Sequence, residues 1–160
     1  MTELPPPELF SEIYRRHGHR CPMSTLGGRL GWAARRRLGG ASRESLSAVF
    51  FHATCAVDGI AVATGCSIAT GSLTVRDAGR HLLVLRDREQ GRQVEVVLRP
   101  AALAIAARYR RLDQALEGRG AGLSQDERRE LEAEKERVLQ QVLEQFWRLP
   151  DDRLLAFEEG

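Results

Sequence analysis

The residues best able to do chemistry lie in three short segments of the chain. The first is His17-Gly18-His19-Arg20-Cys21-Pro22, the second contains Cys55 and Asp58, and the third is Thr64-Gly65-Cys66. Together they hold all three cysteines and two of the four histidines. Imidazole nitrogens and thiolate sulfurs bind zinc and other borderline-soft metals, and three or four of them make a tetrahedral site. The sequence therefore predicts a metal site before it indicates any reaction.

Spacing places several of these groups together. His17, His19 and Cys21 alternate along one short loop, so an extended or turn conformation puts all three on one side. Cys21 and Cys55 are both expected at the N-termini of helices, where the partial positive charge lowers a thiol pKa. The alternative is that the cysteines are small buried hydrophobes, and this alternative is strongest for Cys66.

The remaining polar candidates have several possible roles. Asp58 has three possible roles: metal ligand, partner for an imidazole, or N-cap of a helix. The last two roles are favoured over direct ligation. His52 is expected to be structural within a strand, and His81 to be exposed to solvent. The sequence contains neither a Cys-x-x-Cys pair nor a His-Glu-x-x-His helix, so spacing alone is a weak indication of a metal site.

Length and composition predict one domain in a cytoplasmic protein. The chain has 160 residues, of which 42% are apolar and 29% charged. No apolar run approaches the roughly 20 residues that a membrane span needs, and the first residues lack the pattern of a secretory signal. An odd number of cysteines argues against a disulfide framework and for a reducing compartment.

The charges are unevenly distributed. Only one of the 24 basic residues is a lysine, Lys135, which is more simply explained by codon bias than by a nucleic-acid surface. Residues 1–123 carry a net charge of +7 and residues 124–160 a net charge of −5. The acidic C-terminal part is therefore expected to lie against the basic body or against a partner.

Periodicity and turn residues predict the order of the elements. Helices are expected from Pro7 to Arg16, from Pro22 to Gly39, from Val57 to Thr64, from Ala101 to Leu116, and from a capping box at Ser124 and Glu127 to Trp147. Strands are expected at Leu46 to Thr54, Leu73 to Arg76, His81 to Arg88 and Gln93 to Arg99, and Gly118 to Gly122 as a turn.

The predicted fold class is α+β. It comprises N-terminal helices and an antiparallel β-sheet in meander order, followed by a C-terminal pair of long helices. We expect residues 1–99 to form a metal-binding α+β domain and residues 100–160 a helical extension packed on the same domain. The face of the second helix, expected to be buried, is made by Leu26, Leu30, Ala33, Ala34 and Leu38.

The chain resembles the FmdE family, which takes its name from formylmethanofuran dehydrogenase. The resemblance covers about Tyr14 to Arg99. The shared blocks are His17-Gly-His-x-Cys-Pro22, Gly27-x-Arg29-x-Gly31, Cys55-Ala-Val-Asp58-x-Ile60, Thr64-Gly-Cys66, Gly71-x-Leu73 and Asp77-x-Gly79. It implies an α+β domain, commonly dimeric, whose His and Cys loops gather at a metal-binding pocket, and an association with a molybdenum or tungsten enzyme.

The sequence also departs from the family pattern. Met23 stands where the family has glycine, and Ala69-Thr70-Gly71-Ser72 stands where it tends to have Gly-Lys-Gly-Asn. The missing lysine predicts weak anion binding unless Arg20, Arg29 or Arg80 replaces the charge, and Arg29 is expected to project near the metal loops as a binding residue. No cysteine follows Cys66, so the zinc ribbon of some members is absent.

These observations predict an FmdE-like cytoplasmic metal-binding protein, either an accessory or a metal-dependent protein linked to molybdenum, tungsten or one-carbon redox enzymes. The metal is expected to be zinc, with iron or nickel as alternatives, and no residue has a clear catalytic role. The expected assembly is a homodimer that uses Phe146 and Trp147, with a larger oxidoreductase complex as a further partner. The predicted ligands are His17, His19, Cys21, Cys55 and Cys66, with Asp58 beside them.

Two other hypotheses remain open from the sequence. Cys21 and Cys55 could approach one another without a metal and act as a thiol-based redox or small-molecule sensor. Alternatively, the C-terminal helices could make the chain an interaction module of a larger complex. Neither hypothesis requires nucleic acid or a membrane.

Overall fold

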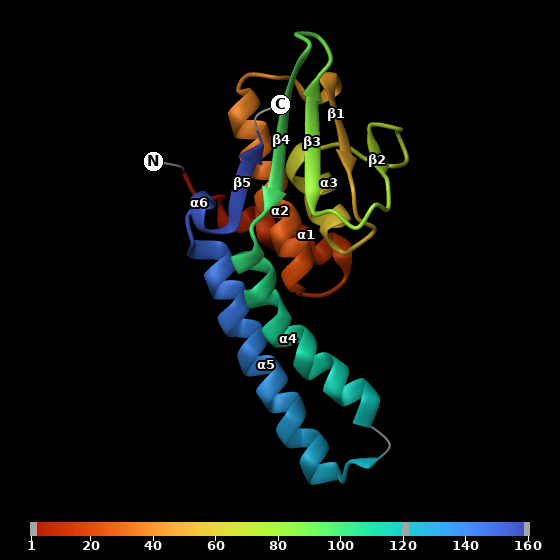
Figure 1. Cartoon of the computed structure of the whole chain (residues 1–160), viewed down its shortest axis with the longest axis vertical. Coiled ribbons are helices and arrows are strands. Elements are labelled where there is room, and N and C mark those ends of the chain that lie inside the picture. Colours follow the sequence, from red (N-terminus) through yellow and green to blue (C-terminus); the bar gives the residue numbers. More distant parts are fainter. Residues whose placement is uncertain (1–2, 120–121, 159–160) are drawn as a thin grey trace.

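The chain folds into a sheet covered by helices, from which a long helical hairpin extends (Figure 1). The computed structural model describes residues 3–119 and 122–158. The helices are α1 Pro7–His17, α2 Pro22–Leu38, α3 Ala56–Thr64, α4 Pro100–Arg119, α5 Gln125–Arg148 and the short α6 Asp151–Leu154, with a 3₁₀ turn at Arg43–Ser45. The strands are β1 Leu46–Phe50, β2 Leu73–Val75, β3 Leu82–Asp87, β4 Arg92–Leu98 and β5 Leu155–Glu158. The α+β class is therefore confirmed.

The five-stranded sheet is mixed, with the order β2-β1-β3-β4-β5. β3 pairs antiparallel with β1 and with β4, and β4 pairs antiparallel with β5. The predicted meander is right for β3 and β4 but wrong for β2, which lies parallel to β1 at the edge of the sheet. The reason is α3, because a helix between two strands lets the second strand return in the same direction.

Several boundaries differ from the prediction. β1 ends at Phe50, and the following residues turn toward α3, so His52 lies outside the strand. Helix α4 continues through Gly118 into the predicted turn, of which residues 120–121 lie outside the described residues. The predicted capping box of α5 is present, with Ser124 and Glu127 bonded to each other's backbone amides. β5 was not predicted.

Helix α2 lies at the centre of the fold. All five residues of its predicted apolar face are buried, and they belong to one hydrophobic core with strands β1, β3 and β4 and helices α3 and α5. The outer face of the sheet is left free by these helices in Figure 1, and half-buried valines such as Val49 and Val84 lie on it. The core therefore forms on one side of the sheet.

Glycines bring α2 and α3 unusually close together. A Cβ atom added to Gly27 would lie 2.0 Å from the carbonyl oxygen of Ala56, and one added to Gly59 would lie 2.0 Å from that of Ser24. A Cβ added to Gly31 would lie 2.8 Å from the Cβ of Ala63. A side chain at Gly27 or Gly59 would overlap main-chain atoms that cannot move aside, so the small residues fix the spacing of the two helices.

A buried arginine ties the end of the chain to α2. The guanidinium of Arg29, which is 0% exposed, donates to the carbonyl oxygens of Phe146 (2.5 Å) and Leu149 (2.7 Å) and to Asp151 Oδ1 (2.9 Å). Burial lowers the pKa of Arg29, and the bond to Asp151 opposes this shift. These bonds hold the end of α5 and the start of α6, after which β5 adds to the sheet beside β4.

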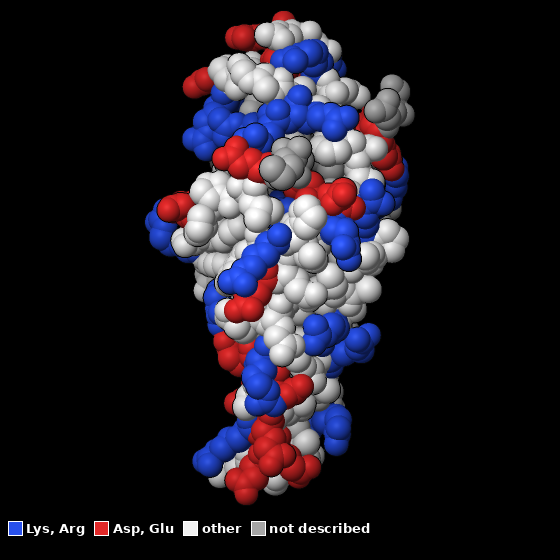
Figure 2. All heavy atoms as spheres, turned by 90° about the vertical axis from the view of Figure 1, so that its left-hand side faces the viewer, with Lys and Arg blue, Asp and Glu red and all other residues white. Residues whose placement is uncertain are grey.

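The hairpin of α4 and α5 carries much of the acidic charge of the C-terminal part. On the face shown in Figure 2, basic side chains gather over the sheet-bearing body, and acidic ones gather near the free end of the hairpin. Ion pairs join the hairpin to the body and its two helices to each other, because Arg20 contacts Glu136 and Lys135 contacts Asp113 at 2.6 Å. Part of the acidic segment thus lies against the basic body.

None of the described helices is long and apolar enough to cross a membrane.

We expect Gly59→Ala to lower the free energy of unfolding by at least about 3 kcal/mol, because its methyl group would overlap the backbone of α2. Gly118→Ala is the matched control. It lies in α4 with nothing within 4 Å of the added Cβ, so it should raise stability by up to about 1 kcal/mol. Urea unfolding monitored by circular dichroism measures both changes. Equal stability of the two variants would contradict the close contact.

Candidate metal centre

The structure brings His17, Cys21 and Cys55 together. One ligand atom from each lies within 4.8 Å of the other two. His17 is the last residue of α1, and Cys21 and Cys55 stand immediately before α2 and α3. Gly18 adopts a left-handed conformation with φ of 96°, which ends α1 and turns the chain so that Cys21 comes back toward His17. Among the described residues, no other three metal-capable side chains lie close enough together to hold one ion.

The His17 ring is oriented as a metal ligand is. Its Nδ1 is 2.7 Å from Oδ2 of Asp58, in the first turn of α3, while its Nε2 is buried without a hydrogen-bond partner among the described residues. A carboxylate that accepts from one ring nitrogen fixes the tautomer and leaves the other nitrogen with its lone pair available. A buried imidazole nitrogen left unpaired is otherwise unfavourable, so the residues present fit a cation at this place.

Asp58 is therefore a partner of the histidine. The side chain of Cys55, at the N-cap of α3, accepts no capping bond, and Asp58 lies within the helix. Of the three predicted roles, the structure supports the one in which Asp58 positions the imidazole. Since the carboxylate contacts His17 at hydrogen-bond distance, it is poorly placed to serve as a free general base.

Cys21 is held firmly by the first turn of α2. Its Sγ accepts the N–H of Ser24 at 3.4 Å, so it is the N-cap that the sequence predicts. Its carbonyl oxygen accepts the hydroxyls of Ser24 (3.0 Å) and Thr25 (2.8 Å). The side chain is buried, and the sulfur position is fixed by the helix, which is the pre-organisation that a ligand needs.

Cys55 differs from the prediction. It is exposed, yet its pKa rises from 9.0 to about 11, first because partial burial disfavours the thiolate and then because of the adjacent Cys21, with Asp58 adding to the effect. A backbone hydrogen bond at the N-terminus of α3 lowers the pKa of Cys55, but the other effects outweigh it, so the expected low pKa is wrong. Without a cation, partial burial and then Cys21 and Asp58 keep the proton on Cys55.

Two predicted ligands lie apart from the group. The ring of His19 stacks against that of His17 with centroids 4.5 Å apart, but it is exposed and its Nδ1 is 3.3 Å from the carbonyl oxygen of Arg20. Cys66 is 1% exposed and belongs to the hydrophobic core, so in this structure it has the role of a small buried hydrophobe.

The other two histidines form a second pair. The rings of His52 and His81 have centroids 4.6 Å apart, and His52 Nδ1 is 3.5 Å from Asp77 Oδ1. His81 is half-buried instead of exposed as predicted, and desolvation followed by the charge of His52 lowers its pKa. Among the described residues, no cysteine joins this pair in a group that could hold one ion. The pair therefore offers a natural control for the His17 site.

Residues 16–156 match the family described as FmdE, molybdenum formylmethanofuran dehydrogenase operon. The chain belongs to the FmdE family. The match extends beyond the segment recognised from sequence blocks and includes α4, α5 and α6, so the helical hairpin is part of the region that the family shares. It also contains His17, Cys21 and Cys55 together with Asp58.

Two known proteins are similar to this FmdE-family chain. A tungsten formylmethanofuran dehydrogenase FmdE-like protein from Syntrophus aciditrophicus has the same fold, with a TM-score of 0.59, 23% identity, and coverage of 96% of this chain and 71% of that one. A probable S-adenosyl-L-methionine-binding protein from Archaeoglobus fulgidus is 34% identical over 86 residues. That segment is 50% of this chain but only 24% of the archaeal protein, so most of the relative has no counterpart here.

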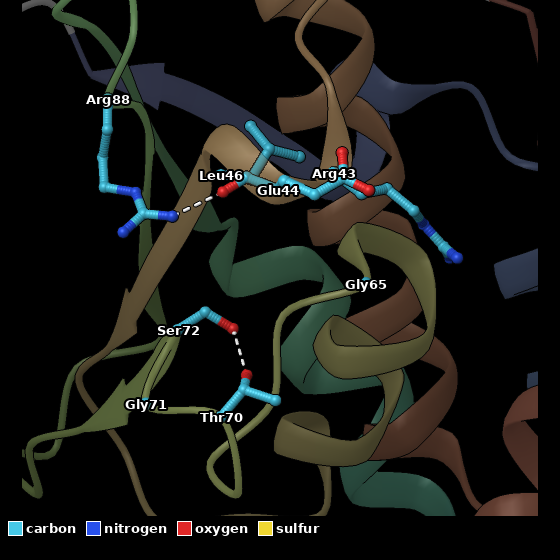
Figure 3. A pocket seen from close by; sticks show the side chains of 8 residues that line it. All are labelled: Arg43, Glu44, Leu46, Gly65, Thr70, Gly71, Ser72 and Arg88. Atoms are coloured by element: carbon cyan, nitrogen blue, oxygen red, sulfur yellow. Dashed lines mark hydrogen bonds between the residues drawn. The ribbon is translucent and has the colours of Figure 1, made fainter.

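The loop in which this member departs from the family borders a hollow of about 370 Å³ (Figure 3). Thr70, Gly71 and Ser72 lie on one side, and Arg43 and Arg88 on the other. These arginines, which sequence reasoning missed, come from the segments before β1 and after β3 and reach the loop only through the strand pairing.

The hollow does not restore a strong anion site. Arg88 already donates to the carbonyl oxygens of Glu44 (2.5 Å) and Ser45 (3.4 Å), and the hydroxyls of Thr70 and Ser72 bond each other at 2.9 Å. Glu44 also lines the hollow and offsets one of its two cations.

The three arginines that the sequence offered as substitutes lie elsewhere. Arg20 contacts Gln140 and Glu136, and Arg80 contacts Glu158 at 3.3 Å. Arg29 does not project toward the metal group, because its guanidinium is taken up by the end of α5 and by Asp151. Its two terminal nitrogens donate within the fold, so the structure does not support Arg29 as a cofactor- or anion-binding residue, and that role stays a prediction.

In metal-free protein, we expect Cys55 to be alkylated slowly at pH 7 to 8, with a rate that rises toward pH 11, because a raised pKa keeps the thiol protonated. Cys21→Ser should lower the midpoint toward 9.0, since it removes the interactions with Cys21 and retains a capping oxygen. Iodoacetamide labelling, resolved by peptide mass spectrometry, reports Cys55 separately. A midpoint below 9.0 in the wild type would contradict the assigned electrostatics.

Proposed function

We propose that this FmdE-family member binds one transition-metal ion through His17 Nε2 and the sulfurs of Cys21 and Cys55. The observation that carries the proposal is the His17 ring. Its Nδ1 contacts Asp58, its buried Nε2 has no partner among the described residues, and one of its ring nitrogens lies within 4.8 Å of both cysteine sulfurs. A set of one nitrogen and two sulfurs favours zinc, with iron or nickel as alternatives.

Three protein ligands leave one position of a tetrahedral ion free. His19 lies beside the site with its ring against that of His17, so water, a small ligand or a rotated His19 would complete the coordination. A bound ion would supply a Lewis acid at that position. The adjacent carboxylate, Asp58, is occupied with His17, which favours a binding or accessory role over acid–base catalysis.

The family supports a proposal for the cellular role. We propose a cytoplasmic accessory or metal-dependent protein that is linked to molybdenum, tungsten or one-carbon redox enzymes. All three cysteines are free, as expected in a reducing compartment. The links to molybdenum and tungsten come from the name of the family and of the Syntrophus aciditrophicus protein.

Protein purified without an affinity metal column should contain about one metal ion per chain. His17→Ala, Cys21→Ser and Cys55→Ser should each reduce that content by more than about tenfold, because each removes one of three ligands. Asp58→Asn should retain metal but weaken its affinity by about tenfold or more, because the imidazole loses its orienting partner. Elemental analysis and competition with a chelating dye measure the two effects.

Controls separate this site from general loss of histidine or cysteine. His52→Ala removes the other histidine that lies beside an aspartate, and Cys66→Ala removes the core cysteine; both should keep full metal content. His19→Ala should also keep it, because the three ligands remain and water can take the position that a rotated His19 would otherwise fill. Loss of metal in these controls together with full retention in Cys55→Ser would place the site elsewhere.

A thiol-based redox role is the second candidate. The sulfurs of Cys21 and Cys55 lie within 4.8 Å of each other, so a modest side-chain rotation brings them to bonding distance. Thiol titration of the as-isolated and the metal-stripped protein distinguishes the two functions. Metal binding masks two thiols that reappear on stripping, whereas a disulfide releases two thiols only on reduction.

We further propose a homodimer, but not through the surface that the sequence suggested. Phe146 is 0% exposed and packs in the core, and Trp147 is half-buried with its Nε1 bonded to the hydroxyl of Tyr14. The uncovered face of the sheet, where the half-buried Val49 pairs with the half-buried Val84, offers an alternative surface for the contact.

Light scattering at micromolar concentration should give about twice the chain mass of 17.8 kDa. Val84→Lys should shift the protein to a monomer, because it places a charge at the centre of the proposed contact. Arg110→Gln, on the exposed side of α4, is the control that should leave the mass unchanged. A monomeric wild type would contradict the proposed dimer and leave the proposed metal site unaffected.

A further inference from the structure

An apolar groove lies at the N-terminal edge of the fold, apart from the metal group. It has a volume of about 530 Å³ and is bounded by the segment before α1, by α1 itself and by the end of α5. Most of its wall is apolar and is formed by Leu4, Pro5, Phe10, Tyr14 and Trp147. This size and lining are typical of a site for a small molecule.

The aromatic walls are rigid. The rings of Phe10 and Trp147 have centroids 6.3 Å apart and are tilted by 41°. Trp147 Nε1 donates to the hydroxyl of Tyr14 at 3.0 Å, and that hydroxyl lies 2.5 Å from Thr25 Oγ1. The polar atoms of the walls are therefore satisfied within the protein, and the wall residues offer a ligand apolar ring surface.

The charged groups at the groove are all positive. Arg20 and Arg148 line it, and no acidic side chain is among the described lining residues. Arg20 is held by Gln140 and Glu136, whereas Arg148 is partly exposed and makes no hydrogen bond or ion pair with the described residues. Glu144, which shares a neighbouring hollow with Arg148, accepts instead from Gln140 at 3.2 Å. Arg148 is thus available to an anionic ligand.

We propose that this groove binds a small amphipathic anion, a flat aromatic or apolar body with a carboxylate, sulfonate or phosphate at one end. The body would lie between the N-terminal segment and Trp147, and the anionic end would meet Arg148. The aromatic walls favour an apolar body, and charge complementarity with Arg148 favours an anionic ligand over a neutral one. The site shares no side chain with the proposed metal centre, so the two proposals fail independently.

Two fluorescent probes of similar size test the proposal. We expect 1-anilinonaphthalene-8-sulfonate, an anion, to bind the wild type at one site and more tightly than neutral N-phenyl-1-naphthylamine. Arg148→Gln should weaken the anionic probe by about tenfold and leave the neutral one within about twofold. Arg110→Gln, an exposed arginine outside the groove, should change neither.

A filling variant tests the place of binding. Ser11 is exposed on α1 and lines the groove, so Ser11→Phe should occupy the space and reduce binding of both probes by more than about tenfold without disturbing the core. Metal-stripped protein should bind the probes as the wild type does. The proposal would be overturned by equal affinity for the two probes or by unchanged binding in Ser11→Phe. It would also be overturned if a second copy of the chain closed the groove to both probes.

Discussion

The close contact between α2 and α3 is the constraint on which the candidate site depends. Each helix begins at a cysteine, so the distance between Cys21 and Cys55 is set by how near the two helix N-termini can approach. Gly27 and Gly59 allow that approach, because a Cβ at either would overlap a main-chain carbonyl of the other helix. The same packing places Asp58 in the first turn of α3, where it reaches the ring of His17. This small-residue contact involves Ala56, which follows Cys55, and Ser24, whose N–H donates to Cys21 Sγ, so it determines the geometry of the metal-capable group.

Arg29 extends this arrangement to the far end of the sequence. It lies on α2 between Gly27 and Gly31. Its guanidinium donates to two carbonyl oxygens near the end of α5 and to Asp151. Carbonyl groups at a helix end lack partners within the helix, and a buried charge needs several bonds to be tolerated. The pairing meets both requirements, and it brings the chain to β5 at the edge of the sheet. The C-terminal segment is therefore bonded into the body of the fold, as expected if the family region extends to residue 156.

Local signals in the sequence were enough for most elements. The apolar face of α2, the N-cap at Cys21 and the capping box at Ser124 depend on residues a few positions apart, and each was found. What failed depends on long-range pairing: β2 joined β1 instead of β3, and the short β5 became a strand only because β4 lay beside it. For the same reason Arg29 and Cys66 were assigned to the site by their nearness in sequence, whereas packing directs one to the chain end and the other to the core. A buried charge in an otherwise apolar helix face was the available signal that Arg29 needed a partner within the protein.

The raised pKa of Cys55 and the unpaired Nε2 of His17 have one physical explanation. Both describe a site arranged for a positive charge. Without a cation, partial burial and then Cys21 and Asp58 keep the proton on Cys55, and the histidine nitrogen has no partner among the described residues. A divalent ion would reverse both effects, because it stabilises thiolates and accepts the nitrogen lone pair. Binding would then release the proton of Cys55, so the affinity for metal would increase with pH up to the pKa of about 11. The features that are unfavourable in the metal-free fold are thus the ones that would make it selective for a charged ligand.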